Sequence, residues 1–264
     1  MSTHQIRYEV SEHIATITLD RPEVMNAFGG TMREDLLARL EEAATDPGVR
    51  CLIITGAGKA FCAGGDVASM AELQARDDTT VLTTRMRAAA RLISFLREIP
   101  KPVIAAVNGA AAGAGMNLAL ACDLRYAAAS AKFSEAFIRI GLVPDWGGHF
   151  LLTELVGPAR ALELIMSGDR IDARDAERLG IVNACFSDED FTTEVRKKAR
   201  MFAAAPAAAI AAIKQGVRRA LRGSLEDTLQ YEMEAQERVF LSADAREGMR
   251  AFLEKRAPRF GPQS

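Results

Sequence analysis

An uncharged stretch over residues 102–122 limits the folds open to this chain more than any other feature. Its sequence, PVIAAVNGAAAGAGMNLALAC, is long enough to cross a bilayer, which takes about 20 apolar residues. Asn108-Gly109 interrupts the run, however, and its second half is rich in Ala and Gly rather than Leu and Ile. We therefore predict a buried strand, a turn with a loop of small residues, and a buried helix inside a globular core, with no membrane as a partner.

The composition is that of a globular protein. A length of 264 residues suits one large domain or a domain with a small appendage, and 49% hydrophobic with 26% charged residues argues against disorder. The net charge of −2 provides no positive field for a phosphate backbone, so no nucleic acid partner is expected. Four cysteines without a Cys-x-x-Cys pair and three histidines predict no metal site. The first ten residues lack an apolar run, so we expect no signal peptide and a cytoplasmic protein.

Apolar strands alternate with helices along most of the chain. We expect strands over 6–10, 14–19, 51–55, 102–107, 124–127 and near 181–186, and helices over 80–96, 116–122, 207–221 and 225–241. Another helix should begin near Thr31, with Thr31 and Glu34 as a capping box. The alternation predicts an α/β core over 1–200, and the helical segment over 201–264 predicts a cap or an assembly surface.

Two loops of the same type are the clearest candidates for a binding site, because common catalytic motifs are absent. There is no Gly-x-Ser-x-Gly elbow, no His-Glu-x-x-His and no Walker lysine loop. The segments 63–66 (AGGD) and 112–115 (AGAG) each follow a buried apolar strand. The second leads into a helix, so its free N–H groups could stabilise an oxyanion together with those of the first. Close strand–helix packing alone would also explain the small residues.

Five segments resemble the crotonase (enoyl-CoA hydratase/isomerase) superfamily, and together they cover nearly the whole chain. They are RPEVMNAF (21–28), LIITGAGKAFCAGGD (52–66), KPVIAAVNGAAAGAG (101–115), AKFSEAFIRIGLVPDWGG (131–148) and EGMRAFLEKRAPRF (247–260). The resemblance implies a spiral of ββα units with a helical C-terminal trimerisation region, assembled as a trimer or a dimer of trimers. It also implies an acyl-CoA thioester substrate whose enolate is stabilised. Coenzyme A is then part of the substrate, and no separate cofactor or metal is expected.

The resemblance assigns roles to individual residues. Gly65 and Ala114 match the two residues whose backbone N–H groups form the oxyanion hole. Residues that match the CoA-binding positions are Val24, Met25, Ala27, Ala63, Gly64, Asp66, Phe252 and Lys255. Phe252 and Lys255 would reach a CoA molecule bound in a neighbouring subunit. Plain helix surface is the alternative for both, and a core position is a further alternative for Phe252.

Acid–base residues separate the branches of this family. Hydratases and dienoyl-CoA isomerases carry acidic side chains where this chain has Asn117 and Phe137, and neither can act as a general base. One carboxyl remains on the expected wall, Asp145, which resembles the base of several family isomerases. An Asp after Pro is also a good helix N-cap, so that role stays open. If Asp145 is catalytic, apolar neighbours such as Phe137, Leu142 and Trp146 would raise its pKa. The dehalogenase branch is set aside, because its histidine has no counterpart here.

Other polar residues near these motifs have simpler interpretations. Glu135 is expected to face solvent or to form an ion pair. Asp66 is expected to cap a short helix over 67–73, and His149 to lie in the first turn of a helix. Trp146 is either part of the acyl pocket or part of the core. Residues 196–198 are expected on a solvated helix face.

The sequence predicts an acyl-CoA isomerase that moves a double bond from C3 to C2, with Asp145 as the proton shuttle. Among family branches, the segments GLVPD-x-GG and EG-x-x-AF-x-x-KR-x-P-x-F look closest to the ring-1,2-epoxyphenylacetyl-CoA isomerases of phenylacetate breakdown, so rearrangement of a ring epoxide is the related possibility. Fatty acid metabolism is the other context. One alternative is hydration, a lyase reaction, with Asp145 activating water. A second is CoA binding without catalysis. RNA binding, known in rare family members, is disfavoured by the acidic pI.

Overall fold

A six-stranded sheet forms the centre of the computed structural model, which describes residues 5–261. The strand order is β1-β2-β3-β5-β7-β10, and all neighbours beyond the β1–β2 hairpin are parallel. Its strands are β1 (Ile6–Ser11), β2 (Ile14–Leu19), β3 (Cys51–Gly56), β5 (Val103–Val107), β7 (Leu124–Ala128) and β10 (Ala184–Phe186). The apolar runs in β3 and β5 are buried, as expected for parallel strands covered on both faces.

A second sheet of short strands continues three strands of the first. Its order is β4-β6-β8-β9, with strands β4 (Ala60–Cys62), β6 (Ala110–Ala112), β8 (Lys132–Ser134) and β9 (Ile171–Asp172). Thus β3, β5 and β7 are each followed by a short strand and then by helix, which produces a repeated ββα unit. No strands were expected at 60–62, 110–112 and 132–134, because three residues are too few to show a strand pattern.

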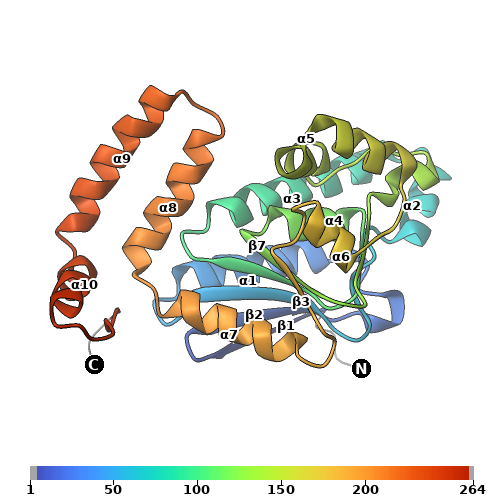
Figure 1. The fold of residues 1–264 in the computed structure, drawn as a ribbon. Coiled ribbons are helices and arrows are strands. Elements are labelled where there is room, and N and C mark those ends of the chain that lie inside the picture. The colour runs from blue at the N-terminus through green and yellow to red at the C-terminus, as the bar shows by residue number, and fades with distance from the viewer. Residues whose placement is uncertain (1–4, 262–264) are drawn as a thin grey trace.

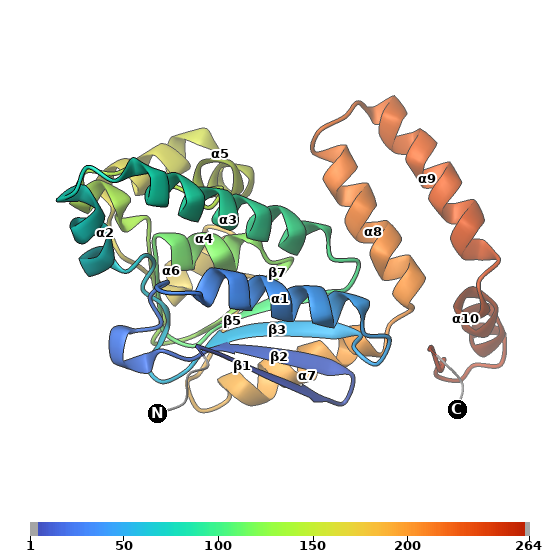
Figure 2. The same ribbon diagram turned by 180° about the vertical axis from the view of Figure 1, so that it is seen from behind.

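Helices cover both faces of the large sheet (Figures 1 and 2). On one face, side chains from alternate strand positions pack with α1, α3, α4 and α5 in the main core. On the other face, Phe191, Val195, Ala199 and Ala203 of α7 form one apolar stripe at four-residue spacing. The helices are η1 (Pro22–Val24), α1 (Met32–Thr45), α2 (Val67–Gln74), α3 (Thr79–Glu98), α4 (Ala114–Ala121), η2 (Ala136–Ile140), α5 (Gly148–Ser167), α6 (Ala173–Arg178), α7 (Phe191–Ala203), α8 (Ala207–Ala220), α9 (Leu225–Phe240) and α10 (Ala243–Leu253).

The last three helices form an extension beside the core. Figures 1 and 2 show α8 and α9 as an antiparallel pair, with α10 at the far end. The middle of α8 is tied to the core by Lys214, whose Nζ donates to the Lys101 carbonyl and pairs with Asp123. Large apolar side chains are exposed along the extension: Ile213, Val217, Leu221, Leu225, Leu229, Met233, Phe240 and Leu241. A surface of this kind marks an interaction site.

Most of the expected elements are present, with two corrections. The strand expected near 181–186 contains only Ala184–Phe186. The Thr31–Glu34 capping box is wrong, because the Thr31 hydroxyl donates to the Asp35 carboxylate (2.9 Å) and makes no cap bond. The uncharged stretch over 102–122 is β5, β6 and α4, as expected for a core segment. Within residues 5–261, none of the helices combines the length and hydropathy needed to cross a membrane.

Candidate active site

The two loops of small residues lie side by side, because the strands that precede them, β4 and β6, pair in parallel. Gly64 has a φ of +99°, a conformation that favours glycine. A Cβ at Gly64 would lie 2.8 Å from the carbonyl oxygen of Ala112 and 3.4 Å from the nitrogen of Ala114. Glycine is therefore needed at position 64 for the close approach of the loops.

Two backbone N–H groups are free where these loops meet. Ala114 is the first residue of α4, so its N–H has no partner inside the helix. Among residues 5–261, neither the Gly65 N–H nor the Ala114 N–H donates a hydrogen bond. Both residues line a cavity of about 140 Å³. Two free N–H groups at one cavity can hold an oxyanion.

The same cavity collects most of the predicted catalytic and CoA-binding residues of the core. Its walls come from the loop before α2, the start of α4, η2 with the loop that follows it, and the first half of α3. The predicted site residues on these walls are Ala63, Gly64, Gly65, Asp66, Ala114 and Asp145. Phe137, Leu142 and Trp146, the apolar neighbours expected for Asp145, also line it.

Asp145 lines the cavity and does not cap α5, the helix that follows it. The N-cap residue of α5 is Gly147, so the interpretation of Asp145 as a helix cap is wrong. Oδ1 of Asp145 is buried and has no hydrogen-bond partner among the described residues. Burial raises the pKa of Asp145 to about 6, while the positive charge of Arg33 lowers it. Such a group is ionised at neutral pH and can still accept a proton, as a general base must.

Arg33 is a cavity residue that the sequence analysis missed. Its side chain comes from α1 and is 8% exposed. The guanidinium lies 5.7 Å from the ring centroid of Phe28 and 5.9 Å from that of Trp146. These two rings contact each other at a tilt of 36°, with centroids 4.3 Å apart. Because arginine stays charged even when burial lowers its pKa, Arg33 provides positive potential beside Asp145.

A signal for Arg33 was present in the sequence. It precedes Leu36 and Leu37 by three and four residues, so it lies on the apolar stripe of α1 rather than on the solvent face. A charged residue on such a stripe is a candidate for a buried role. Arg85, from α3, is a second cationic lining residue that was missed, and its Nη2 donates to the Ser69 hydroxyl (2.9 Å).

The two positions that carry glutamate in family hydratases have other functions here. Phe137, in η2, lines the cavity and is 8% exposed. Asn117, in α4, is fully buried, and its Nδ2 donates to the Asp145 carbonyl oxygen (2.8 Å). One position is thus an apolar wall and the other holds the Asp145 loop, and neither supplies an acid or a base.

Glu135 contradicts its sequence interpretation. It was expected to face solvent or to form an ion pair, but it is only 1% exposed, and both carboxyl oxygens lack a hydrogen-bond partner among the described residues. Burial raises the pKa of Glu135 to about 8. Glu135 directly follows β8 and continues a buried segment, because Phe133 and Ser134 before it are buried as well.

The segment predicted to lie along CoA is anchored beside the first loop. Asn26 is fully buried, and its Nδ2 donates to the carbonyl oxygens of Ala57, Ala60 and Phe61. The Met25 carbonyl accepts from the Ala63 N–H (2.9 Å). Of the predicted contacts, Val24 and Met25 are exposed and Ala27 is buried. The segment borders the site without lining the cavity.

Three other predictions about single residues agree with the structure. Asp66 caps α2, since Oδ1 accepts from the Ser69 N–H (3.2 Å), and its other oxygen lies 3.6 Å from Nη2 of Arg21. His149 is in the first turn of α5 and is exposed. Trp146 lines the cavity and is also buried, so both of its interpretations hold.

Phe252 and Lys255 do not join the cavity within one chain. Phe252 is in α10 and is 83% exposed, and Lys255 follows that helix. Figure 1 shows α10 at the end of the extension, apart from α2, α4 and α5. A contact with CoA in a neighbouring subunit therefore stays a prediction.

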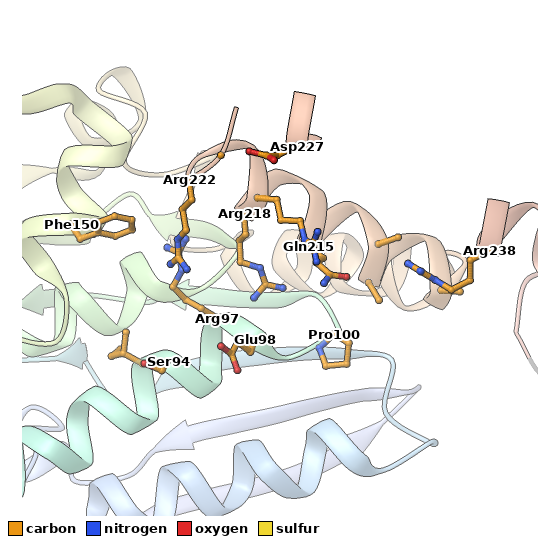
Figure 3. Close-up of a pocket in the computed structure, with 16 residues that line it drawn as sticks. Ser94, Arg97, Glu98, Pro100, Phe150, Gln215, Arg218, Arg222, Asp227 and Arg238 are labelled. Carbon is orange, nitrogen blue, oxygen red and sulfur yellow. The ribbon is translucent and has the colours of Figure 1, made fainter. Parts of the chain in front are cut away.

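A larger cleft, of about 1100 Å³, contains none of the predicted site residues. It lies between the C-terminal end of α3 and helix α8, and Figure 3 shows Arg97, Arg218 and Arg222 close together within it. The smaller cavity is the candidate active site, because it combines free N–H groups with a carboxyl of raised pKa. Among residues 5–261, no group of three His, Cys, Asp or Glu side chains is arranged to hold a metal ion.

Comparisons with known proteins agree with this geometry. The family model described as enoyl-CoA hydratase/isomerase matches residues 9–263. A protein of Rhodobacter capsulatus named probable enoyl-CoA hydratase is 45% identical over 98% of this chain and 99% of its own. The 1,2-epoxyphenylacetyl-CoA isomerase of Escherichia coli is 39% identical over 95% and 96% of the two chains. A crystal structure of an enoyl-CoA hydratase from a Polaromonas species superimposes with a TM-score of 0.93, at 36% identity, over 97% and 99% of the chains. The predicted crotonase-like fold is thereby confirmed.

Proposed function

Because the chain belongs to the enoyl-CoA hydratase/isomerase family, we propose that it is an acyl-CoA isomerase that moves a double bond from C3 to C2 of an enoyl-CoA. The observation that supports this most directly is the carboxyl of Asp145 on the cavity wall, whose Oδ1 has no hydrogen-bond partner among the described residues, with Asn117 and Phe137 at the two hydratase positions. One carboxyl suffices for a proton shuttle, whereas efficient hydration needs further acid–base groups around the water.

The proposed reaction uses both sides of the cavity. The Asp145 carboxylate removes a proton from C2, and the electron pair moves onto the thioester oxygen. The N–H groups of Gly65 and Ala114 hold this enolate oxygen. The enolate then collapses to a C2–C3 double bond as protonated Asp145 returns the proton to C4. CoA belongs to the substrate, and the reaction requires neither a metal nor a redox cofactor.

The CoA moiety and the assembly complete the proposal. CoA would lie along Val24, Met25 and Ala27, beside the loop of Ala63, Gly64 and Asp66. In a trimer or a dimer of trimers, Phe252 and Lys255 would approach CoA from a neighbouring copy. The chain would then divide into a core with the CoA and acyl site over 1–200 and a helical trimerisation region over 201–264. The exposed apolar side chains of α8 and α9 support self-association. Light scattering should give a mass of three or six chains; a monomer would contradict this.

Two other reactions have specific support. Rearrangement of a ring-epoxide acyl-CoA is supported by the Escherichia coli relative. Hydration with Asp145 activating water is supported by the name of the Rhodobacter capsulatus relative, although the residues at positions 117 and 137 argue against it.

Proton NMR in D2O distinguishes between these possible reactions. Mixing the protein with 3-hexenoyl-CoA should move the double bond to C2 and introduce deuterium into the product. A 3-hydroxyacyl-CoA signal would favour the hydratase. If neither appears, ring-type acyl-CoAs are tested next. CoA binding without any turnover would favour a non-catalytic role.

A further inference from the structure

The carboxyl group of Glu135 is enclosed in the interior of the protein. It is 1% exposed at the start of η2, and no cation lies within ion-pair distance of it among residues 5–261. An unpaired buried carboxylate carries a desolvation penalty that ordinarily leads to protonation. Glu135 is also not part of the cavity wall, although Ala136 and Phe137, which follow it, are.

A second unsatisfied polar atom lies beside Glu135. Asn117 is fully buried, and its Oδ1 has no hydrogen-bond partner among the described residues. Its amide is close enough to the Glu135 carboxyl to influence its pKa. The backbone also brings the two residues together, because the Gly113 N–H donates to the carbonyl oxygen of Ser134 (2.9 Å), and Asn117 lies one helical turn after Gly113. If Glu135 is ionised, both of its carboxyl oxygens and the Asn117 Oδ1 are acceptors without a donor among the described residues. A proton on Glu135 would supply the missing donor.

We propose that Glu135 is protonated at neutral pH, donates a hydrogen bond to Oδ1 of Asn117, and through Asn117 positions the catalytic base Asp145. The chain then runs from the Glu135 hydroxyl to Asn117, and from Nδ2 of Asn117 to the Asp145 carbonyl oxygen at 2.8 Å. The Asn117 amide packs against Gly148, since a Cβ at that position would lie 2.4 Å from its Nδ2. The inference rests on the proposed function, since Asp145 is a catalytic base only there.

The charges around Glu135 agree with a neutral carboxyl. Burial is the largest cause that raises the pKa of Glu135 to about 8, the Asn117 amide lowers it, and the negative charge of Asp145 raises it further. The other charged groups on the neighbouring elements are occupied or exposed. Arg33, on α1, acts on Asp145; Arg139, on η2, pairs with Asp169 at the surface; and His149, on α5, is exposed.

Loss of the Glu135 proton should therefore impair catalysis. Above about pH 8 the donor to Asn117 disappears, and a second negative charge forms near Asp145. The Asn117 side chain, and with it the loop that carries Asp145, would be held less firmly. The value of kcat should therefore decrease at alkaline pH, and this decrease should depend on the residue at position 135. A purely structural role of Glu135 would not produce such a pH dependence.

The first test is the pH profile of double-bond migration in three proteins: wild type, Glu135→Gln and Glu135→Met. Gln keeps a donor at every pH and Met removes it at similar volume. We expect kcat of the wild type to decrease above about pH 8. In Glu135→Gln this decrease should be absent, and kcat at pH 7 should stay near the wild-type value. Glu135→Met should lose kcat about tenfold at pH 7 with little change in KM, because a displaced base slows chemistry more than binding. An unchanged alkaline decrease in Glu135→Gln, or full activity in Glu135→Met, would overturn the proposal.

The second test does not depend on activity. A carboxyl whose pKa is higher in the folded than in the unfolded protein stabilises the fold at low pH, and this contribution declines as pH rises toward the folded value. The free energy of unfolding of wild type relative to Glu135→Gln should therefore fall between about pH 4.5 and about pH 8 and then level off. A difference that does not change with pH would show that Glu135 is not protonated. If this decline is found but no isomerase activity exists, the proposed function fails and the protonation of Glu135 stands.

Discussion

The cavity has two sides built in different ways. On one side, the loops at Gly65 and Ala114 offer backbone N–H groups that have no partner among the described residues. On the other, Asp145 offers a carboxyl whose Oδ1 has none. One side supplies donors and the other acceptors. An enolate needs both, because its oxygen needs donors and the carbon that loses the proton needs a base.

The two sides should respond differently to mutation and pH. The donor side depends on backbone conformation, so only changes that move the loops should affect it. The carboxyl side depends on protonation, so it should respond to pH and to charges that lie near it. The following predictions test this contrast.

A large effect is expected on the donor side, from Gly64→Ala. The new Cβ would lie 2.8 Å from the Ala112 carbonyl oxygen at a φ of +99°, so the loops must move apart. We expect kcat on a 3-enoyl-CoA to fall about 100-fold, with the shape of the pH profile unchanged.

Gly157→Ala is the matched control for Gly64→Ala. Gly157 also has a positive φ, of 75°, but no atom lies within 4 Å of a Cβ placed there, and it lies at the kink of α5 outside the cavity. It should cost some stability and leave kcat near wild type. Equal losses in both variants would mean that backbone strain, and not the N–H pair, explains the effect.

On the carboxyl side, activity should fall with acid. Asp145 acts as a base only when ionised, and its pKa is about 6 in the folded protein. The value of kcat/KM should therefore decrease about tenfold per pH unit below that value. A profile that stays flat down to pH 5 would exclude Asp145 as the base.

Replacement of Arg33 should shift the decrease of kcat/KM at acid pH without changing the kcat/KM value reached at higher pH. Arg33 lowers the pKa of Asp145, so Arg33→Leu should raise this pKa and move this decrease to higher pH. At pH 6 we expect a loss of about threefold in kcat/KM, and at pH 8 almost none. Arg85→Leu is the control, because Arg85 lines the same cavity and has no resolved effect on the pKa of Asp145. Equal shifts in both would contradict the specific role of Arg33.

The smallest effect is expected far from both sides, at Lys255. If it contacts CoA in a neighbouring subunit, Lys255→Ala should raise KM about threefold and leave kcat and the pH profile unchanged, since an exposed ion pair contributes little. Lys197→Ala, on the exposed face of α7 beside Glu194, should change neither parameter. A change in kcat at Lys255 would point to a different role.

The sequence predicted the backbone side of the site better than the carboxyl side. The loops at Gly65 and Ala114 follow apolar strands and carry small residues, and both features are local. The interior position of Glu135 depends on the register of β8, a strand of three residues that leaves little pattern to recognise. The role of Asp145 depended on where α5 begins, and the sequence offers two acceptable N-cap residues, Asp145 and Gly147.

The fold was predictable for a related reason. The strands β3 and β5 are continuous apolar runs, and α8 and α9 have clear helical spacing. The short strands β4, β6, β8 and β9 were missed, because they are held by pairing with one another rather than by their own residue pattern. Arg33 was missed because a charged side chain is ordinarily expected to face solvent. Its position on the apolar stripe of α1 indicated instead that it is buried.

The central claim is that Asp145 moves the proton between C2 and C4, and one comparison tests it most directly. Double-bond migration of 3-hexenoyl-CoA is followed by proton NMR in D2O with wild type and Asp145→Asn, and CoA affinity is measured for both. We expect wild type to form the 2-enoyl product and Asp145→Asn to lose at least about 100-fold in rate at unchanged CoA affinity. Migration at the wild-type rate in Asp145→Asn would contradict the account, because no proton could then pass through that carboxyl.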